Sequence, residues 1–98
     1  MFKISRVDTP NQLRLVLEGK LIAPWADELK ATCERALAQL NGRELVVDLK
    51  CLTTISQQGE NLLVELMELG VKCRGRDLFT KQFLKHLAQR LRSNGANR

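Results

Sequence analysis

The segment at residues 44–49 most constrains the fold, because its centre at 45–47 is an unbroken apolar run, Leu-Val-Val, between polar ends. A short apolar run rich in branched residues favours a strand that is covered on both faces. Amphipathic helical patterns stand on either side of it, at 26–40 and 62–69. Helices between strands are typical of a parallel sheet with crossover connections. The sequence therefore predicts an α/β domain with residues 44–49 at the centre of the sheet.

Two alternating apolar and polar stretches, at 2–7 and 13–18, flank the turn formers at 8–12. This pattern predicts an antiparallel hairpin with one buried face, whose second strand is closed by Gly19. Pro24 then suits the first turn of the following helix, because the amide that proline lacks would have no partner there.

A short strand is predicted at 71–74, followed by a last helix with Thr80 as its N-cap. Phe79 and Leu84 are spaced as a hydrophobic staple around that cap, and the aromatic residues of this helix are expected in the core. The predicted order is β-β-α-β-α-β-α, a mixed sheet of about four strands with three helices, most of them on one side.

The chain has 98 residues, of which 44% are hydrophobic and 28% charged. These values predict a single folded domain and exclude a disordered or fibrous chain. We assign residues 1–92 to the domain and 93–98 to a flexible tail. No apolar run approaches the roughly 20 residues that cross a bilayer, and the first residues do not resemble a signal peptide. We therefore expect a cytoplasmic protein without membrane insertion.

Three cysteines, Cys33, Cys51 and Cys73, are odd in number and form no C-x-x-C pair. This spacing argues against a disulfide framework or a metal site and favours thiols in a reducing compartment. Cys33 and Cys73 fit core positions, whereas Cys51 follows a strand end and is expected to be partly exposed.

Catalytic motifs are not evident in the sequence. The only histidine, His86, has a lysine and apolar residues as sequence neighbours, so a structural role is favoured over general-base chemistry. No phosphate-binding glycine loop or nucleophile elbow is found. We expect neither an enzyme nor a cofactor.

The basic charge is concentrated in the last quarter of the chain. Residues 1–71 carry eight Lys/Arg against ten Asp/Glu, and residues 72–98 carry eight against one. A basic patch on the last helix is formed by Lys81, Lys85, Arg90 and Arg92. It would suit an acidic protein partner, or in the alternative reading a nucleic acid, although aromatic residues for base stacking are few.

The strand at 45–49, ending in Asp-Leu, and the segment Ile-Ser-Gln-Gln-Gly at 55–59 before an apolar helix resemble the STAS domain. The segment Leu-Val-Leu-Glu-Gly-Lys-Leu at 15–21 is similar to the second strand of that family, and the resemblance covers roughly residues 12 to 90. It implies a STAS-like (SpoIIAA-like) fold, which is the fold of bacterial anti-sigma factor antagonists.

The family's tetrad is typically Asp-Ser-Ser-Gly, in which a partner kinase, itself the anti-sigma factor, phosphorylates a serine. In this chain Ser56 stands at the aspartate position, Gln57 and Gln58 replace both serines, and only Gly59 matches. Glutamine has no hydroxyl group, so the usual switch is not available at those two positions. One hypothesis is that the loop binds a partner without phosphorylation. The other is that the switch moves to Ser56, or less readily to Thr53 or Thr54. For Ser56 a helix-capping role is favoured over phosphorylation.

The resemblance implies a protein-binding adaptor that regulates a partner such as an anti-sigma factor or kinase. The expected partner-binding residues are Ser56, Gln57, Gln58, Gly59, Glu60 and Leu63. Another signalling complex or a lipid transporter is an alternative partner, since small STAS proteins accompany such transporters. The sequence also leaves a homodimer open.

Overall fold

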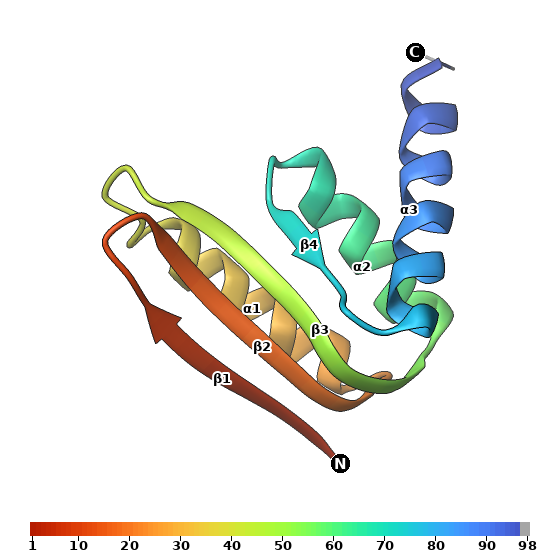
Figure 1. Ribbon diagram of the computed structural model, residues 1–98, viewed down its shortest axis with the longest axis horizontal. Coiled ribbons are helices and arrows are strands. Elements are labelled where there is room, and N and C mark those ends of the chain that lie inside the picture. Colours follow the sequence, from red (N-terminus) through yellow and green to blue (C-terminus); the bar gives the residue numbers. More distant parts are fainter. Residues whose placement is uncertain (97–98) are drawn as a thin grey trace.

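Four strands form one mixed sheet in the order β1-β2-β3-β4, with three helices, in the computed structural model, which describes residues 1–96 (Figure 1). The elements are β1 Phe2–Asp8, β2 Gln12–Leu21, α1 Trp25–Leu37, β3 Glu44–Ile55, α2 Gln57–Glu68, β4 Lys72–Arg74 and α3 Leu78–Ala96. This is the predicted element order, and β3 lies inside the sheet as expected.

β1 and β2 form the predicted antiparallel hairpin, with Ile4 opposite Leu17. Its turn is closed by Thr9, whose hydroxyl accepts a hydrogen bond from the Gln12 amide at 2.9 Å. β2 pairs with β3 and β3 with β4 in parallel, so each of the two connections is a crossover through a helix.

Both crossover helices lie on one face of the sheet, where a single hydrophobic cluster joins them to the strands. α1 contributes Leu29 and Cys33 to this cluster, and α2 contributes Leu62 and Leu63. Figure 1 shows α1 behind β2 and β3, and α3 standing beside α2 and β4. α3 adds Leu87, which is 0% exposed. Most helix packing is therefore on one side of the sheet, as predicted.

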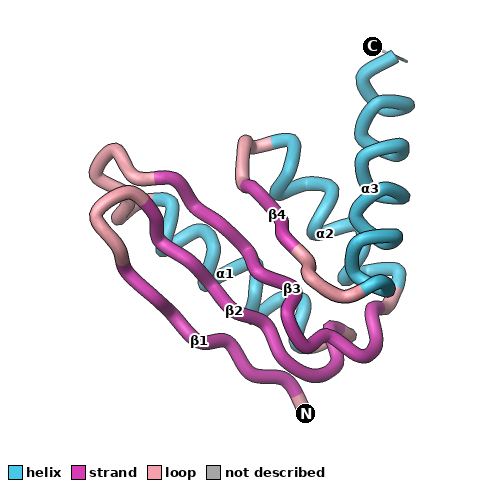
Figure 2. Tube along the Cα trace, in the orientation of Figure 1, coloured by secondary structure: helices cyan, strands magenta, loops and turns pink. Residues whose placement is uncertain are grey.

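β2 and β3 are longer than the sequence pattern indicates. β2 continues past Gly19 to Leu21, and β3 continues past Leu49 to Ile55, so that Leu21 and Ile55 are paired at the shared end. Figure 2 shows both strands running past β4 toward the start of α2. Gly19 marks a shift in the pairing register rather than a strand end, and its φ of +98° is one that residues with side chains rarely adopt.

The start of α3 corrects the predicted cap. Asp77 is the capping residue, because its Oδ1 accepts hydrogen bonds from the Thr80 amide and the Thr80 hydroxyl, both at 2.7 Å. These bonds also hold the pKa of Asp77 below its usual value. Thr80 instead lies in the first turn and is 0% exposed. Phe79 is 50% exposed, so neither the predicted staple nor its placement in the core is correct.

The end of the chain is more helical than predicted. α3 continues to Ala96, so residues 93–96 belong to a helix where the sequence pattern predicted a flexible tail. Residues 97–98 of that predicted tail lie outside the described residues.

Gly59 joins α2 closely to the end of β2. The Leu21 carbonyl accepts a hydrogen bond from the Ser56 amide at 3.0 Å. A Cβ atom on Gly59 would lie only 2.6 Å from the same carbonyl oxygen. The absence of a side chain at this position is therefore what allows the first turn of α2 to approach β2.

The cysteines occupy the environments that the sequence predicted. Cys33 is buried, Cys73 is half-buried and Cys51 is exposed. Burial raises the pKa of Cys33 to about 11 and that of Cys73 to about 12, which keeps both thiols protonated and unreactive near neutral pH.

We expect Gly59→Ala to destabilise the fold by about 2 kcal/mol, because the added methyl group must displace backbone atoms. The free energy of unfolding, measured in urea, tests this. Gln58→Ala at the neighbouring exposed helix position is the matched control and should change it by less than about 0.5 kcal/mol. Equal stability of Gly59→Ala and the wild type would refute the close packing.

In thiol labelling of the folded protein at mildly alkaline pH, we expect one fast-reacting cysteine, Cys51, because the other two thiols are shielded and have raised pKa values. Cys51→Ser should remove the fast phase and leave the slow one. A fast phase that persists in that variant would mean that the core around Cys33 or Cys73 is open.

Candidate functional site

The first turn of α2 is capped by Ser56, as the sequence predicted. Its backbone is extended, with φ −78° and ψ 170°, and its hydroxyl accepts a hydrogen bond from the Gly59 amide at 3.2 Å. This bond satisfies one of the amides that a helix start leaves without a backbone partner. Ser56 is half-buried and its hydroxyl has a structural role.

The two glutamines of the motif are both exposed. Gln57 donates through Nε2 to Asn61 Oδ1 at 3.0 Å, which holds its side chain along the helix. Gln58 lines a shallow hollow of about 210 Å³ between α2 and α1. Its amide forms no hydrogen bond with the described residues, so both its donor and its acceptor are open to a partner.

Glu60 faces α3 rather than a prospective partner. Its side chain is 17% exposed, and its Oε1 lies 3.0 Å from His86 Nε2. Arg90 forms an ion pair with the second oxygen of Glu60 and also donates to Asn61 Oδ1 at 3.0 Å. These contacts tie the start of α2 to the middle of α3, and give His86 a carboxylate partner that its sequence neighbours did not indicate.

The predicted partner-binding residues therefore divide into three groups. Gln57 and Gln58 are at the surface. Ser56 is engaged by the Gly59 amide, and Glu60 by residues of α3. Gly59 is buried and Leu63 is 0% exposed, so the Leu63 side chain belongs to the core and we remove it from the candidate surface. It points inward because the apolar stripe of α2 must face the sheet.

The predicted basic patch is also divided. Lys81, Lys85 and Arg92 are exposed, whereas Arg90 is half-buried in its ion pair with Glu60. Residues three or four positions apart share a face of a helix. Lys81, Lys85 and Arg92 lie on one such face, whereas Arg90 lies on another.

An aromatic group that the sequence pattern missed adjoins the motif. The rings of Phe79 and Phe83 are stacked with centroids 6.3 Å apart, and the ring of Phe83 lies 6.3 Å from that of His86. His86 contacts Glu60 in the first turn of α2. The sequence contains a signal for the exposure of Phe79. The apolar stripe of α3, followed back from Leu84 in a step of four residues, reaches position 80 rather than position 79.

We name the residues at the start of α2 and on the facing turns of α3 the tip surface. Its residues are Gln57, Gln58, Phe79, Phe83 and His86. Gln58 lies on the side of α2 toward α1. Figure 1 shows the start of α3 beside the connection from β3 to α2, which brings the two segments together. The surface combines uncharged amides at the start of α2 with a half-exposed aromatic ring at the start of α3.

Within residues 1–96 no group of three or more His, Cys, Asp or Glu side chains is placed to hold a metal ion. None of the described helices has the length and apolar character needed to span a bilayer.

Comparisons with known proteins give a likeness in structure. No family model matches the sequence, and no curated protein matches it either. The structure is similar to that of an uncharacterized protein of the DUF3478 family from Shewanella loihica PV-4, which is described as having a SpoIIAA-like fold. The TM-score is 0.57 at 18% identity, and the alignment covers 81% of this chain and 70% of that chain. Together with the element order, this likeness shows that the chain has the SpoIIAA-like fold of STAS domains.

Proposed function

We propose that this chain is a non-enzymatic, cytoplasmic adaptor of the STAS type that binds another polypeptide through its tip surface. The observation that carries the proposal is that Gln57 and Gln58 are exposed on the capped start of α2 while Phe79 is half exposed at the start of α3. The SpoIIAA-like fold supports the class of domain, and the residues of the surface support the mode of binding.

The chemistry of the tip surface suits a protein partner. Interface centres are enriched in aromatic residues and depleted of charges, and Phe79 with Gln57 and Gln58 has that composition. An amide side chain both donates and accepts, so Gln58 can pair with a backbone peptide group of the partner. The cap at Ser56 and the ion pair at Glu60 hold these groups in place before binding, which lowers the entropy lost on association.

A signalling protein of the anti-sigma factor or kinase type is the partner that the fold favours. The exposed Lys81, Lys85 and Arg92 on α3 would steer an acidic partner toward the molecule. Nucleic acid is less well supported, because the rings of Phe79 and Phe83 are stacked on each other and Phe83 is half-buried, which leaves little aromatic surface for base stacking.

We propose further that binding is not controlled by phosphorylation at this loop. The positions of both family serines carry glutamine, and the Ser56 hydroxyl is engaged by the Gly59 amide. Control of the partner would then rest on the amount of the adaptor present.

Ser56→Ala should lower the free energy of unfolding by about 1 kcal/mol, because the cap hydrogen bond is lost, whereas Ser56→Gly should cost only a few tenths. Intact mass of the protein after incubation with a cognate kinase should be that of the unmodified chain. A mass increase that Ser56→Ala abolishes would contradict the proposal and return the switch to Ser56.

Binding to the native partner should be weakened about tenfold or more by Phe79→Ser, and also by the double change Gln57→Ala with Gln58→Ala, because both remove contacts at the centre of the surface. The partner is first identified by photo-cross-linking from position 58 in native cells, and its affinity is then measured with purified proteins.

Leu69→Ser is the matched control for Phe79→Ser, because Leu69 is an exposed apolar residue, 63% exposed, at the opposite end of α2. It should leave the affinity unchanged. If Leu69→Ser and Phe79→Ser weaken binding equally, or if neither does, the tip surface is not the docking site.

A further inference from the structure

The sheet face that carries neither α1 nor α2 holds a buried charge. Along β2 and β3 the side chains alternate, so that Leu15 and Val47 face the helices while Arg14 and Asp48 face the other way. Asp48 is only 5% exposed, and its Oδ1 is buried without a hydrogen-bond partner among the described residues. Burying a carboxylate oxygen without a hydrogen-bond donor costs free energy, so we expect this oxygen to have a partner.

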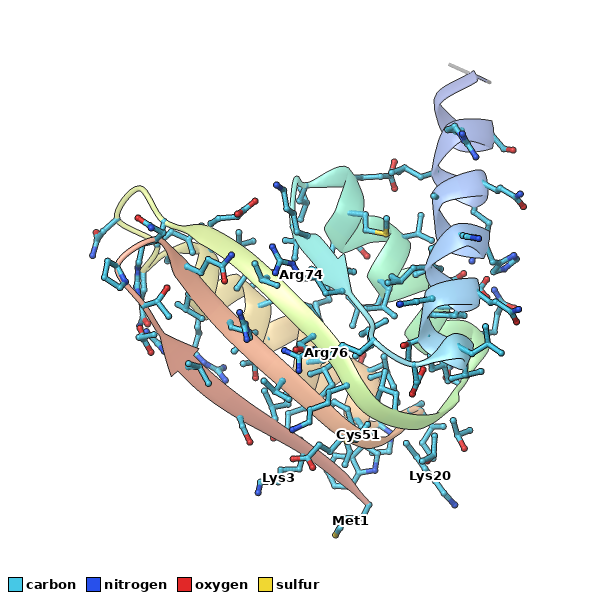
Figure 3. The ribbon with its side chains drawn as sticks, in the orientation of Figure 1. Met1, Lys3, Lys20, Cys51, Arg74 and Arg76 are labelled. Carbon is cyan, nitrogen blue, oxygen red and sulfur yellow. The ribbon has the colours of Figure 1, made fainter. Side chains whose placement is uncertain are left out.

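Three arginines surround this carboxylate. Arg74 stands directly opposite Asp48 in the pairing of β3 with β4. Arg14 is a diagonal neighbour on β2, and its Nε is likewise buried without a hydrogen-bond partner. Arg76 follows Arg74 by two residues, and neither forms a hydrogen bond or ion pair with the described residues. Figure 3 shows Arg74 and Arg76 lying over the sheet on the side away from α1.

These groups line one hollow of about 360 Å³. Its lining residues are Arg14, Asp48, Arg74, Gly75, Arg76 and Leu84. The volume is within the range of pockets for small molecules. The close packing of Gly75 against Thr80, where a Cβ atom would lie 2.3 Å from the Thr80 hydroxyl oxygen, places the β4–α3 connection at the edge of the hollow.

The charges of the lining residues indicate the charge of the ligand. Three guanidinium groups against one carboxylate leave two uncompensated positive charges, which match the charge of about −2 on a phosphate monoester. An ionised carboxylate only accepts hydrogen bonds, and no donor among the described residues reaches Asp48 Oδ1, so a hydroxyl group of the ligand can supply one. A small molecule can enter the hollow and reach a 5% exposed carboxylate, whereas a flat protein surface cannot.

We propose that this hollow, the arginine hollow, binds a small phosphate monoester that carries a neighbouring hydroxyl group. The phosphate lies among the guanidinium groups of Arg14, Arg74 and Arg76, and the hydroxyl donates to Asp48. The site is separate from the tip surface and shares no residue with it.

Glycerol 3-phosphate is a small probe with both groups, and n-propyl phosphate is its matched control, since it has the same carbon chain without the hydroxyls. We expect titration of the protein, followed by amide NMR shifts, to give saturable binding of glycerol 3-phosphate about tenfold tighter than that of n-propyl phosphate. The largest shifts should be at Gly75 and Arg76.

Variants test which residues contact the phosphate and which contact the hydroxyl group. Arg76→Gln should weaken both phosphates about tenfold, because one charged contact is lost. Asp48→Asn should abolish most of the preference for glycerol 3-phosphate while leaving n-propyl phosphate bound as tightly or more tightly, since a negative charge beside the phosphate is removed. Arg35→Gln, a change at an exposed arginine on α1, is the control and should alter neither affinity.

Three results would overturn the proposal. One is the absence of saturable binding of glycerol 3-phosphate up to roughly 10 mM. Another is equal weakening by Arg35→Gln and Arg76→Gln, which would mean attraction to the basic surface as a whole. The third is equal affinity of the wild type for the two phosphates, which would remove the role of Asp48.

Discussion

The carbonyl of Leu21 is the point on which the candidate binding surface depends. It accepts the Ser56 amide where β3 ends, and Gly59 packs directly against it where α2 begins. The ends of two strands and the start of a helix are thereby fixed to one buried position, since Leu21 is 0% exposed. This junction fixes the position of the exposed glutamines. The ion pair between Glu60 and Arg90 links the junction to α3.

The sequence predicted the fold to the extent that apolar periodicity reports burial. The run at 45–47 and the stripes of α1 and α2 correctly predicted the parallel crossovers, because each pattern reflects one buried face. Element ends were predicted less well. β3 continues to residue 55 because its ladder with β2 persists after the apolar run ends, and strand pairing of that kind leaves no periodic signal. Asp77 rather than Thr80 caps α3, a choice that depends on which residue the β4–α3 connection leaves outside the helix.

The candidate site was predicted in part, and the omissions have a common cause. Sequence spacing located the α2 start and the Ser56 cap, which are local features. It could not show that Glu60 pairs with residues 26 and 30 positions away on α3, or that Phe79 remains half exposed at the start of that helix. The sequence did not predict the arginine hollow for the same reason, because Arg14, Asp48 and Arg74 come from three strands and meet only in the sheet.

Hydrogen–deuterium exchange of the chain alone and in complex with its partner tests the central claim most directly. Binding through the tip surface predicts slower exchange of the amides at residues 57–61 and 78–83, with the amides of α1 unchanged. Protection confined to α1, or to the outer edge of β1, with residues 57–61 unaffected would contradict the account.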